Sequence, residues 1–275
     1  MPLVTMKDLL EKAEKNSKAV GAFSVGNMEM IMGAVRAAEE TETPIILQIA
    51  EKRLPYSPLE LIGPMMIAAA ENSETDICVH LDHGLTYETV CDALDLGFTS
   101  VMLDSSALPL EENIEATVEV VETAAEYGAT VEAELGLVGG AEGGACHEIQ
   151  CTDPDIAKRY CDETGIDALA VAIGNAHGRY PTLPELRFDI LEKINKECSV
   201  PLVLHGGTGI TPADFRRCIE NGVRKINIAT ASFEAVVKAS EASAAQKLDY
   251  FAASAATVDA VCENVKKHIE IFNMR

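Results

Sequence analysis

The stretch Ile77-Cys78-Val79-His80-Leu81-Asp82-His83-Gly84 decides how the rest of the chain is interpreted. Its apolar first half predicts a strand at 77–82, and a helix at 86–96 follows, with a threonine as N-cap and a glycine just past its end. An Asp and a His therefore stand side by side where a strand ends. The same setting recurs at Ile173-Gly174-Asn175-Ala176-His177-Gly178 and at Leu202-Val203-Leu204-His205-Gly206. Three strand-end histidines, each followed by glycine, favour one shared explanation, a common metal ion.

Composition narrows the class of protein. The 275 residues suffice for one large α/β domain, and we expect 1–275 to be that single domain. The formal net charge of −22 argues against nucleic acid or an anionic membrane as partner. The N-terminus lacks the basic and apolar regions of a signal peptide, and no apolar run is long enough for a membrane span. We therefore expect a cytoplasmic protein.

The eight cysteines include no C-x-x-C pair. Most lie in apolar strand or helix patterns, where cysteine is usually a small buried hydrophobe. This predicts a reducing compartment without a disulfide framework. Cys146, His147 and Cys151 share one loop and form an alternative metal-binding group, but an ordinary loop is the preferred interpretation.

Strand and helix patterns alternate along the whole chain. Apolar runs predict strands at 19–25, 44–49, 77–82, 99–103, 130–135, 168–173, 201–204 and 223–228. Helical spacing predicts helices at 5–17, 28–41, 58–71, 86–96, 112–127, 154–164 and 188–198, from Thr211 to Gly222, and through most of the remaining chain.

Eight βα units with continuous apolar strands indicate a parallel sheet buried on both faces, and in one domain of this length they predict a (β/α)8 barrel. An open doubly wound sheet is the alternative fold. It would be favoured by G-x-G-x-x-G at the first βα turn, where the chain instead has Val25-Gly26-Asn27-Met28-Glu29. The Gly-rich loop at 136–144 is long for a βα connection and suggests a lid.

A barrel would bring the polar strand ends together, because catalytic groups gather at the C-terminal ends of its strands. His83, His177 and His205 would then form a catalytic zinc site with an open fourth position. Three hydrogen-bonded structural histidines are the alternative. His80, two residues before Asp82, is expected to point inward below the site and make a buried hydrogen bond, with metal ligation as a minority alternative.

Carboxylates accompany these histidines. Asp82, beside a ligand at the barrel mouth, suits proton transfer, and its alternative role is to orient a ligating histidine. Glu134 ends one strand, and Asp104, followed by Ser106, ends another and is expected to support the site.

Two elements predict phosphate binding at the loops after the last two strands. The first element is His205-Gly206-Gly207-Thr208-Gly209-Ile210, whose glycines leave backbone amides accessible before a helix. The second element is Asn227-Ile228-Ala229-Thr230, where the last strand ends and the last helical region begins. Loops after strands seven and eight recurrently bind phosphate in barrels, and helix N-termini favour anions.

The segments 80–84, 131–136, 139–142, 171–178, 204–210 and 227–230 together resemble the class II, zinc-dependent ketose-bisphosphate aldolases, a group that includes fructose- and tagatose-bisphosphate enzymes. The motifs occur in the family's order and span nearly the whole chain. The resemblance implies a barrel enzyme that reversibly cleaves a phosphorylated ketose to dihydroxyacetone phosphate and an aldehyde. It also implies Zn²⁺, often with a monovalent cation (Na⁺ or K⁺) nearby, and we expect a homodimer or homotetramer.

The resemblance also assigns roles. His83, His177 and His205 would be the zinc ligands, with Glu134 near the metal. Asp82 would be the acid/base at the C4 oxygen, and Glu142 on the Gly-rich loop would move the carbon proton of dihydroxyacetone phosphate. The phosphate end would be held by Gly178, Gly206, Gly207, Thr208, Asn227 and Thr230. No Schiff base is needed, and Lys225, the formal rival nucleophile, is expected near the wrong end of its strand.

Two positions depart from the family pattern. The first strand is followed by Gly26 where the family usually has a polar residue such as asparagine, and the second by Ala50 where serine is common. Both positions face the substrate in the family, so recognition of the aldehyde half is expected to be altered.

Two other functions explain part of the pattern. A zinc hydrolase of the barrel class would use the histidines but neither the phosphate elements nor Glu142. A non-catalytic sugar-phosphate binder would need a lost catalytic residue, and none is missing among the ligands or at Asp82.

Overall fold

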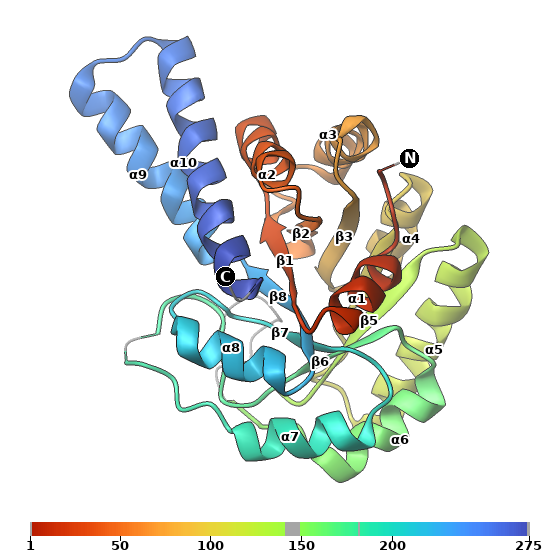
Figure 1. The fold of residues 1–275 in the computed structure, drawn as a ribbon. Coiled ribbons are helices and arrows are strands. Elements are labelled where there is room, and N and C mark those ends of the chain that lie inside the picture. The colour runs from red at the N-terminus through yellow and green to blue at the C-terminus, as the bar shows by residue number, and fades with distance from the viewer. Residues whose placement is uncertain (1, 141–148, 181, 274–275) are drawn as a thin grey trace.

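The computed structural model describes residues 2–140, 149–180 and 182–273. Eight parallel strands close into a barrel in the order β1 to β8, and helices surround it (Figure 1). The strands are β1 (Val20–Ser24), β2 (Ile45–Ala50), β3 (Ile77–Gly84), β4 (Ser100–Leu103), β5 (Thr130–Leu135), β6 (Ala168–Val171), β7 (Leu202–Leu204) and β8 (Val223–Ile228). The predicted (β/α)8 barrel is therefore confirmed.

The helices follow the strands as expected. They are α1 (Met6–Lys15), α2 (Met28–Glu40), α3 (Leu59–Asn72), α4 (Tyr87–Asp95), α5 (Leu110–Tyr127), α6 (Pro154–Thr164), α7 (Phe188–Glu197), α8 (Pro212–Glu220), α9 (Thr230–Gln246) and α10 (Tyr250–Phe272), with a 3₁₀ turn, η1 (Glu51–Arg53), after β2. The predicted C-terminal helical region is two helices, because Lys247 takes a left-handed φ of 54° and ends α9. α9 and α10 project from the barrel as a pair (Figure 1).

The interior of the barrel changes from apolar to polar along its axis. Because side chains alternate along a strand, every second residue points inward. At the N-terminal end these are apolar residues such as Ala22, Ile46 and Ala168, and α1 closes that end by packing Met6 and Leu9 against them. One step further along the strands the buried side chains are polar: Gln48, His80, Glu132 and Lys225. These four polar residues interrupt the apolar strands and form a polar layer inside the barrel.

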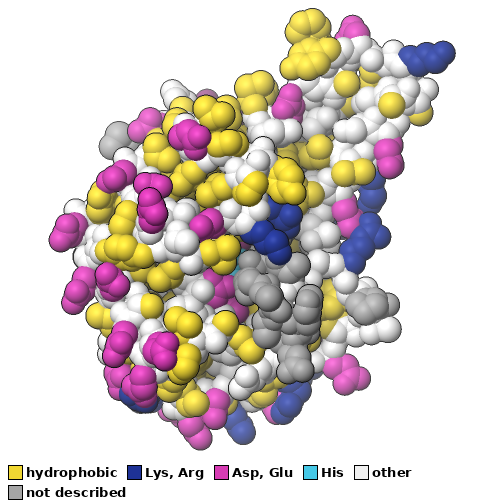
Figure 2. Space-filling model, turned by 180° about the vertical axis from the view of Figure 1, so that it is seen from behind, with side chains coloured by type: hydrophobic (Ala, Val, Ile, Leu, Met, Phe, Trp, Pro, Cys, Tyr) yellow, Lys and Arg dark blue, Asp and Glu magenta, His cyan; other side chains and the backbone are white. Residues whose placement is uncertain are grey.

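The surface matches the composition. Acidic side chains outnumber basic ones on the face shown in Figure 2, in keeping with the net charge of −22. Among the described residues, no helix is both long and apolar enough to span a membrane.

Candidate active site

A bulge at the end of β3 turns two consecutive side chains toward the barrel mouth. In a regular strand Asp82 and His83 would point to opposite faces. Here the pairing of β3 with β4 shifts register between Leu81 and Gly84, and His83 has a left-handed φ of 42°. A Cβ on Gly84 would lie 2.5 Å from the backbone oxygen of Met102, so only glycine fits this bulge. Strain of this kind is concentrated at functional sites.

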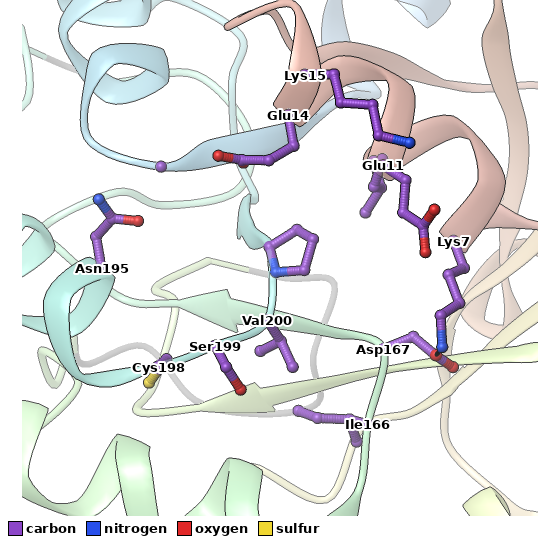
Figure 3. A pocket seen from close by; sticks show the side chains of 13 residues that line it. Lys7, Glu11, Glu14, Lys15, Ile166, Asp167, Asn195, Cys198, Ser199 and Val200 are labelled. Carbon is purple, nitrogen blue, oxygen red and sulfur yellow. Dashed lines mark ion pairs between the residues drawn. The ribbon is translucent and has the colours of Figure 1, made fainter.

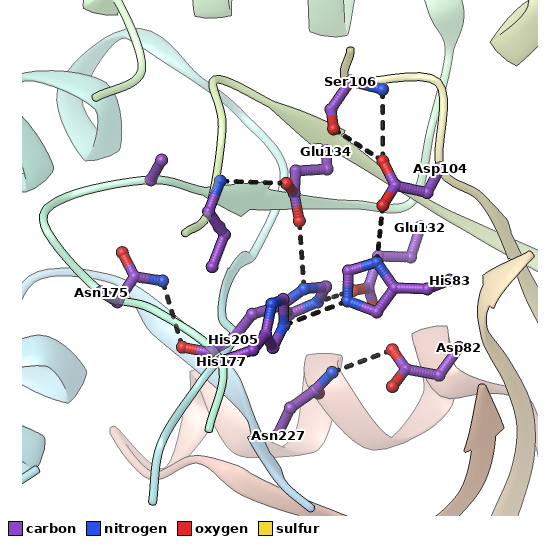
Figure 4. A network of polar contacts seen from close by, with 12 residues as sticks. Asp82, His83, Asp104, Ser106, Glu132, Glu134, Asn175, His177, His205 and Asn227 are labelled. Carbon is purple, nitrogen blue, oxygen red and sulfur yellow. Dashed lines mark hydrogen bonds and ion pairs between the residues drawn. The ribbon is translucent and has the colours of Figure 1, made fainter. Parts of the chain in front are cut away.

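His83, His177 and His205 meet at the barrel mouth and are hereafter the histidine cluster (Figure 4). Ligand atoms from the three rings lie within 4.8 Å of one another, and the Nε2 atoms of His83 and His177 are 3.2 Å apart. Among the described residues, Nδ1 of His177 and Nδ1 of His205 are buried without a hydrogen-bond partner. Buried nitrogens are rarely left unpaired, and three converging imidazoles fit a bound divalent cation.

Carboxylates contact two of the three imidazole rings of the histidine cluster and orient them. Asp104 Oδ2 lies 2.7 Å from Nδ1 of His83, and Glu132 Oε1 lies 2.7 Å from Nε2 of His205 (Figure 4). Each carboxylate favours a proton on the ring nitrogen that it contacts and leaves the other nitrogen to bind a metal. Glu134 Oε2 is 3.1 Å from Nδ1 of His205 but lacks the alignment of a hydrogen bond.

The same carboxylates make the cluster attractive to positive charge. Burial opposes protonation of His83, but Asp82 and Asp104 outweigh it and raise the pKa of this imidazole to about 10. Burial also opposes protonation of His205, but the two glutamates beside it raise its pKa to about 9. Burial and the other two rings hold the pKa of His177 well below its ordinary value. One cation shared by the three rings would replace these competing protons.

Asp82 is buried and held by two amides. Gln48 Nε2 donates to Oδ2 over 2.9 Å, and Asn227 Nδ2 donates to Oδ1 over 3.0 Å. These bonds fix the carboxylate on the β3 side of the histidine cluster (Figure 4). A fixed carboxylate beside a candidate metal site has the geometry required of a general acid or base.

A fully buried lysine connects the two halves of this network. Lys225 Nζ lies 2.7 Å from Glu132 Oε2, on the carboxylate that also contacts His205. The same Nζ donates to Asn227 Oδ1 over 2.7 Å, which directs the Asn227 amide nitrogen toward Asp82. Lys225 therefore lies beneath the mouth, engaged by two partners, and is not placed as a nucleophile.

A small glycine-lined cavity adjoins the cluster. It is lined by His177, Gly178, Gly206, Gly207, Thr208, Asn227, Ala229 and Thr230, so it brings together all six residues predicted to bind phosphate. Gly206 has a φ of 64°, and a Cβ there would lie only 2.1 Å from the Ala176 oxygen. Thr208 Oγ1 accepts a hydrogen bond from the Ala231 amide in the first turn of α9. Backbone amides and a helix N-terminus around one cavity suit an anion.

The profile of the family described as "Fructose-bisphosphate aldolase class-II" matches residues 4–275. The chain belongs to this family. The aldolase is thus a carbon–carbon lyase. It is 40% identical over 255 residues to a "Probable fructose-bisphosphate aldolase" of Bacillus subtilis, covering 91% of this chain and 90% of that protein. It is 42% identical over 243 residues to a Staphylococcus aureus "Fructose-bisphosphate aldolase", covering 87% and 85%.

Solved structures agree with these sequence matches. The crystal structure of the YdjI aldolase from Escherichia coli K12 superposes with a TM-score of 0.89 at 34% identity, covering 98% of this chain and 97% of that one. A putative fructose-1,6-biphosphate aldolase from Coccidioides immitis gives a TM-score of 0.90 at 32% identity, covering 97% and 95%.

Several predicted positions of the aldolase can now be placed. His80 is fully buried and its Nδ1 lies 2.8 Å from Ser100 Oγ, which fulfils the expected buried hydrogen bond. Burial, followed by the charge of Lys225, lowers the pKa of His80 to about 3, so this ring is neutral. Glu142, Cys146 and His147 lie outside the described residues.

Sequence reasoning missed Glu132 and Gln48 and gave Lys225 no role in the aldolase site. A signal was available, because Glu132 stands two residues before Glu134 and Lys225 two before Asn227. Residues two apart share a strand face. A polar residue two positions earlier in the sequence than a predicted site residue was therefore a candidate for the polar layer inside the barrel, beneath the site.

A second cavity of the aldolase lies at the opposite end of the barrel, between α1 and the loops before β6 and β7 (Figure 3). An ion pair of 3.2 Å between Lys7 and Asp167 lies at its edge. None of the predicted site residues lines it, and barrel active sites lie at the C-terminal face. We assign this cavity to the packing of α1.

Proposed function

We propose that this aldolase reversibly cleaves a phosphorylated ketose to dihydroxyacetone phosphate and an aldehyde, with zinc as its metal. The observation that carries the proposal is the histidine cluster, with its unpaired buried nitrogens, directly beside the glycine-lined cavity. His83, His177 and His205 would hold the zinc, with Glu134 and Asp104 as supporting carboxylates. Bound zinc would act as a Lewis acid that stabilises the negative charge of the enediolate.

The protein's own residues would perform the remaining steps. Asp82, oriented by Gln48 and Asn227, would remove the proton of the C4 hydroxyl as the C3–C4 bond breaks, and would return it in the reverse direction. Glu142 would transfer the proton at the dihydroxyacetone phosphate carbon. The phosphate would lie in the glycine-lined cavity, beside a Na⁺ or K⁺ ion, held by Gly178, Gly206, Gly207, Thr208, Asn227 and Thr230.

The test is a cleavage screen of ketose mono- and bisphosphates with purified protein and zinc. Release of a triose phosphate supports the aldolase reaction, and release of inorganic phosphate alone would support a zinc hydrolase. Binding of a dihydroxyacetone phosphate enediolate mimic without turnover of any substrate would indicate a sugar-phosphate binder.

Replacing either proposed carboxylate should separate two partial reactions. Asp82→Ala should abolish carbon–carbon cleavage but leave part of the exchange of tritium from labelled dihydroxyacetone phosphate, because that exchange needs only the metal and a carbon base. Glu142→Ala should strongly slow the exchange. Losing a proton-transfer group typically costs a factor on the order of 10²–10⁴. Equal loss of both reactions in both variants would show that the roles are assigned wrongly.

Fructose 1,6-bisphosphate should be a poor substrate, and other ketose 1-phosphates or unusual bisphosphates should be cleaved comparably or better. Gly26 and Ala50 have no polar side chain to hydrogen-bond a substrate hydroxyl, and a pocket without such contacts discriminates weakly. The measurement is kcat/KM across a panel of ketose phosphates. A value on the order of 10⁴ M⁻¹s⁻¹ or above for fructose 1,6-bisphosphate, with clear preference over every other compound, would refute this prediction.

We also propose that residues 1–275 form one aldolase domain that works in the cytoplasm as a homodimer or homotetramer. The closed barrel and the family match over residues 4–275 support the single domain. The tip of the α9–α10 pair supports assembly, since Tyr250 and Phe251 are 73% and 79% exposed there. Large exposed aromatic side chains often mark protein contacts.

A further inference from the structure

Two hydrogen bonds fasten the loop that carries His177 to the loop that carries His205. Before His177 in the chain, Asn175 Nδ2 donates to the His205 backbone oxygen over 3.1 Å (Figure 4). After His177, Tyr180 Oη donates to the Gly206 backbone oxygen over 2.9 Å. His177 therefore lies between two attachments to the loop after β7.

The hydroxyl of Tyr180 is both an acceptor and a donor. It accepts a hydrogen bond of 2.8 Å from the backbone amide of Ala176, the residue before His177, while it donates to Gly206. Burial raises the pKa of Tyr180 to about 12, so the hydroxyl keeps the proton that it donates. Gly206 lines the glycine-lined cavity. One hydroxyl thus bridges the backbone beside a candidate metal ligand and the backbone of the candidate phosphate site.

The orientation of His177 depends on its backbone more than that of the other two histidines does. Carboxylates contact the rings of His83 and His205. None of the described carboxylates forms a hydrogen bond or an ion pair with His177, whose backbone amide donates to the Gly139 oxygen over 2.6 Å. An interaction that fixes the loop after β6 therefore also fixes this ring.

Phosphate binding would act on the same connection. A phosphate in the glycine-lined cavity would order the loop after β7, because Gly206 and Thr208 of that loop line the cavity. The Tyr180 hydroxyl would transmit this order to Ala176 and the neighbouring His177. A ligand that is already held in place loses less conformational entropy when the metal binds. Zinc should then bind more tightly to the phosphate-bound protein, and phosphate more tightly, by the same factor, to the zinc-bound protein.

We infer that Tyr180 is a positioning residue that couples zinc binding at His177 to phosphate binding in the glycine-lined cavity. This inference rests on the proposed function. It assigns part of the energy of phosphate binding to the ordering of a metal ligand, so the phosphate would assist chemistry at the other end of dihydroxyacetone phosphate. The hydroxyl acts through the backbone of the two loops and needs no contact with the substrate.

The first experiment measures zinc affinity with and without inorganic phosphate. A competing chelator sets the free zinc concentration, and potassium chloride replaces potassium phosphate at equal potassium concentration. Phosphate should raise the zinc affinity of wild type by about fivefold or more. Tyr180→Phe removes only the hydroxyl and should reduce this factor by about 2- to 10-fold, the usual range for one hydrogen bond. Any direct contact between phosphate and zinc is the same in both proteins and cancels in the comparison.

Proton exchange at the zinc-loaded site gives an independent measurement. Tyr180→Phe should lower kcat/KM for exchange of labelled dihydroxyacetone phosphate by about 3- to 10-fold, and for unphosphorylated dihydroxyacetone by less than about twofold. Added inorganic phosphate should accelerate the exchange of dihydroxyacetone more in wild type than in the variant. Tyr127→Phe is the matched control. It removes a tyrosine hydroxyl that bonds Asp95 at the surface and should leave both the coupling and the exchange unchanged.

Each result decides between outcomes. Equal losses for the phosphorylated and unphosphorylated substrates in Tyr180→Phe would mean that the hydroxyl only supports the structure, and the inference would fall. It would also fall if phosphate left the zinc affinity of wild type unchanged, a result that does not depend on how the variant folds. A protein that cleaves no ketose phosphate would refute the proposed function, whereas normal cleavage without the coupling would refute this inference alone.

Discussion

Replacing His177 with alanine should remove both the bound zinc and the aldolase activity while the protein stays folded. His177 lies in a loop after β6, and its ring meets His83 and His205 only at the barrel mouth. Two remaining histidines leave a divalent cation without its third protein ligand. Because a metal Lewis acid contributes several kcal/mol to a transition state, activity should fall by a factor on the order of 10³ or more. His83→Ala and His205→Ala should behave alike.

The measurements are metal content per subunit, cleavage rate and circular dichroism. Wild type should contain one zinc per subunit, lose activity with a chelator and regain it when zinc is restored. His268→Ala is the control, since this histidine packs in α10 with its Nδ1 at the Asn264 backbone oxygen, away from the cluster. A fully metallated and active His177→Ala protein would overturn the ligand assignment.

Lys225→Met should be the most destabilising single change at the site. It leaves the Glu132 carboxylate buried without its cation, and breaking a buried ion pair in this way typically costs about 3–5 kcal/mol. For a chain of this size the melting temperature should fall by roughly 5–15 °C. Zinc affinity should fall by about 10- to 100-fold, because Glu132 orients His205. Cleavage should slow further, since Asn227 loses the partner that directs its amide toward Asp82.

A double variant separates the charge effect from simple loss of packing. Lys225→Met with Glu132→Gln removes both charges, so most of the melting temperature should return while cleavage remains slow. Lys158→Met, which breaks an exposed ion pair with Asp162, should leave stability and zinc content unchanged. If Lys225→Met alone kept wild-type stability and zinc affinity, the proposed connection from Lys225 to His205 would be wrong.

The fold was predictable because its signals are local. The run 44–49 is apolar except for Gln48, and β2 covers Ile45–Ala50, since a parallel strand buried on both faces is mostly apolar. Boundaries were less predictable. The strand expected at 77–82 continues to Gly84 because a bulge extends the pairing with β4. The strand expected at 168–173 ends at Val171 in the structure.

The residues of the site were identifiable from the sequence, but their arrangement was not. Three His-Gly pairs at strand ends were sufficient to select His83, His177 and His205, and the glycine and threonine pattern selected the cavity beside them. That selection needed only residue type and position relative to a strand. The assignment of the zinc, substrate and proton-transfer roles to particular residues stays a prediction.

By itself, then, the sequence determined the βα alternation, the strand ends that carry polar groups and the resemblance to a family. Only the tertiary structure decided that Asp82 and His83 both enter the mouth, because that depends on a bulge against β4. It alone joined Lys225 to Glu132 across the barrel and Tyr180 to Gly206 between two loops. The physical reason is that these contacts link strands and loops far apart in the chain, so no local pattern encodes them.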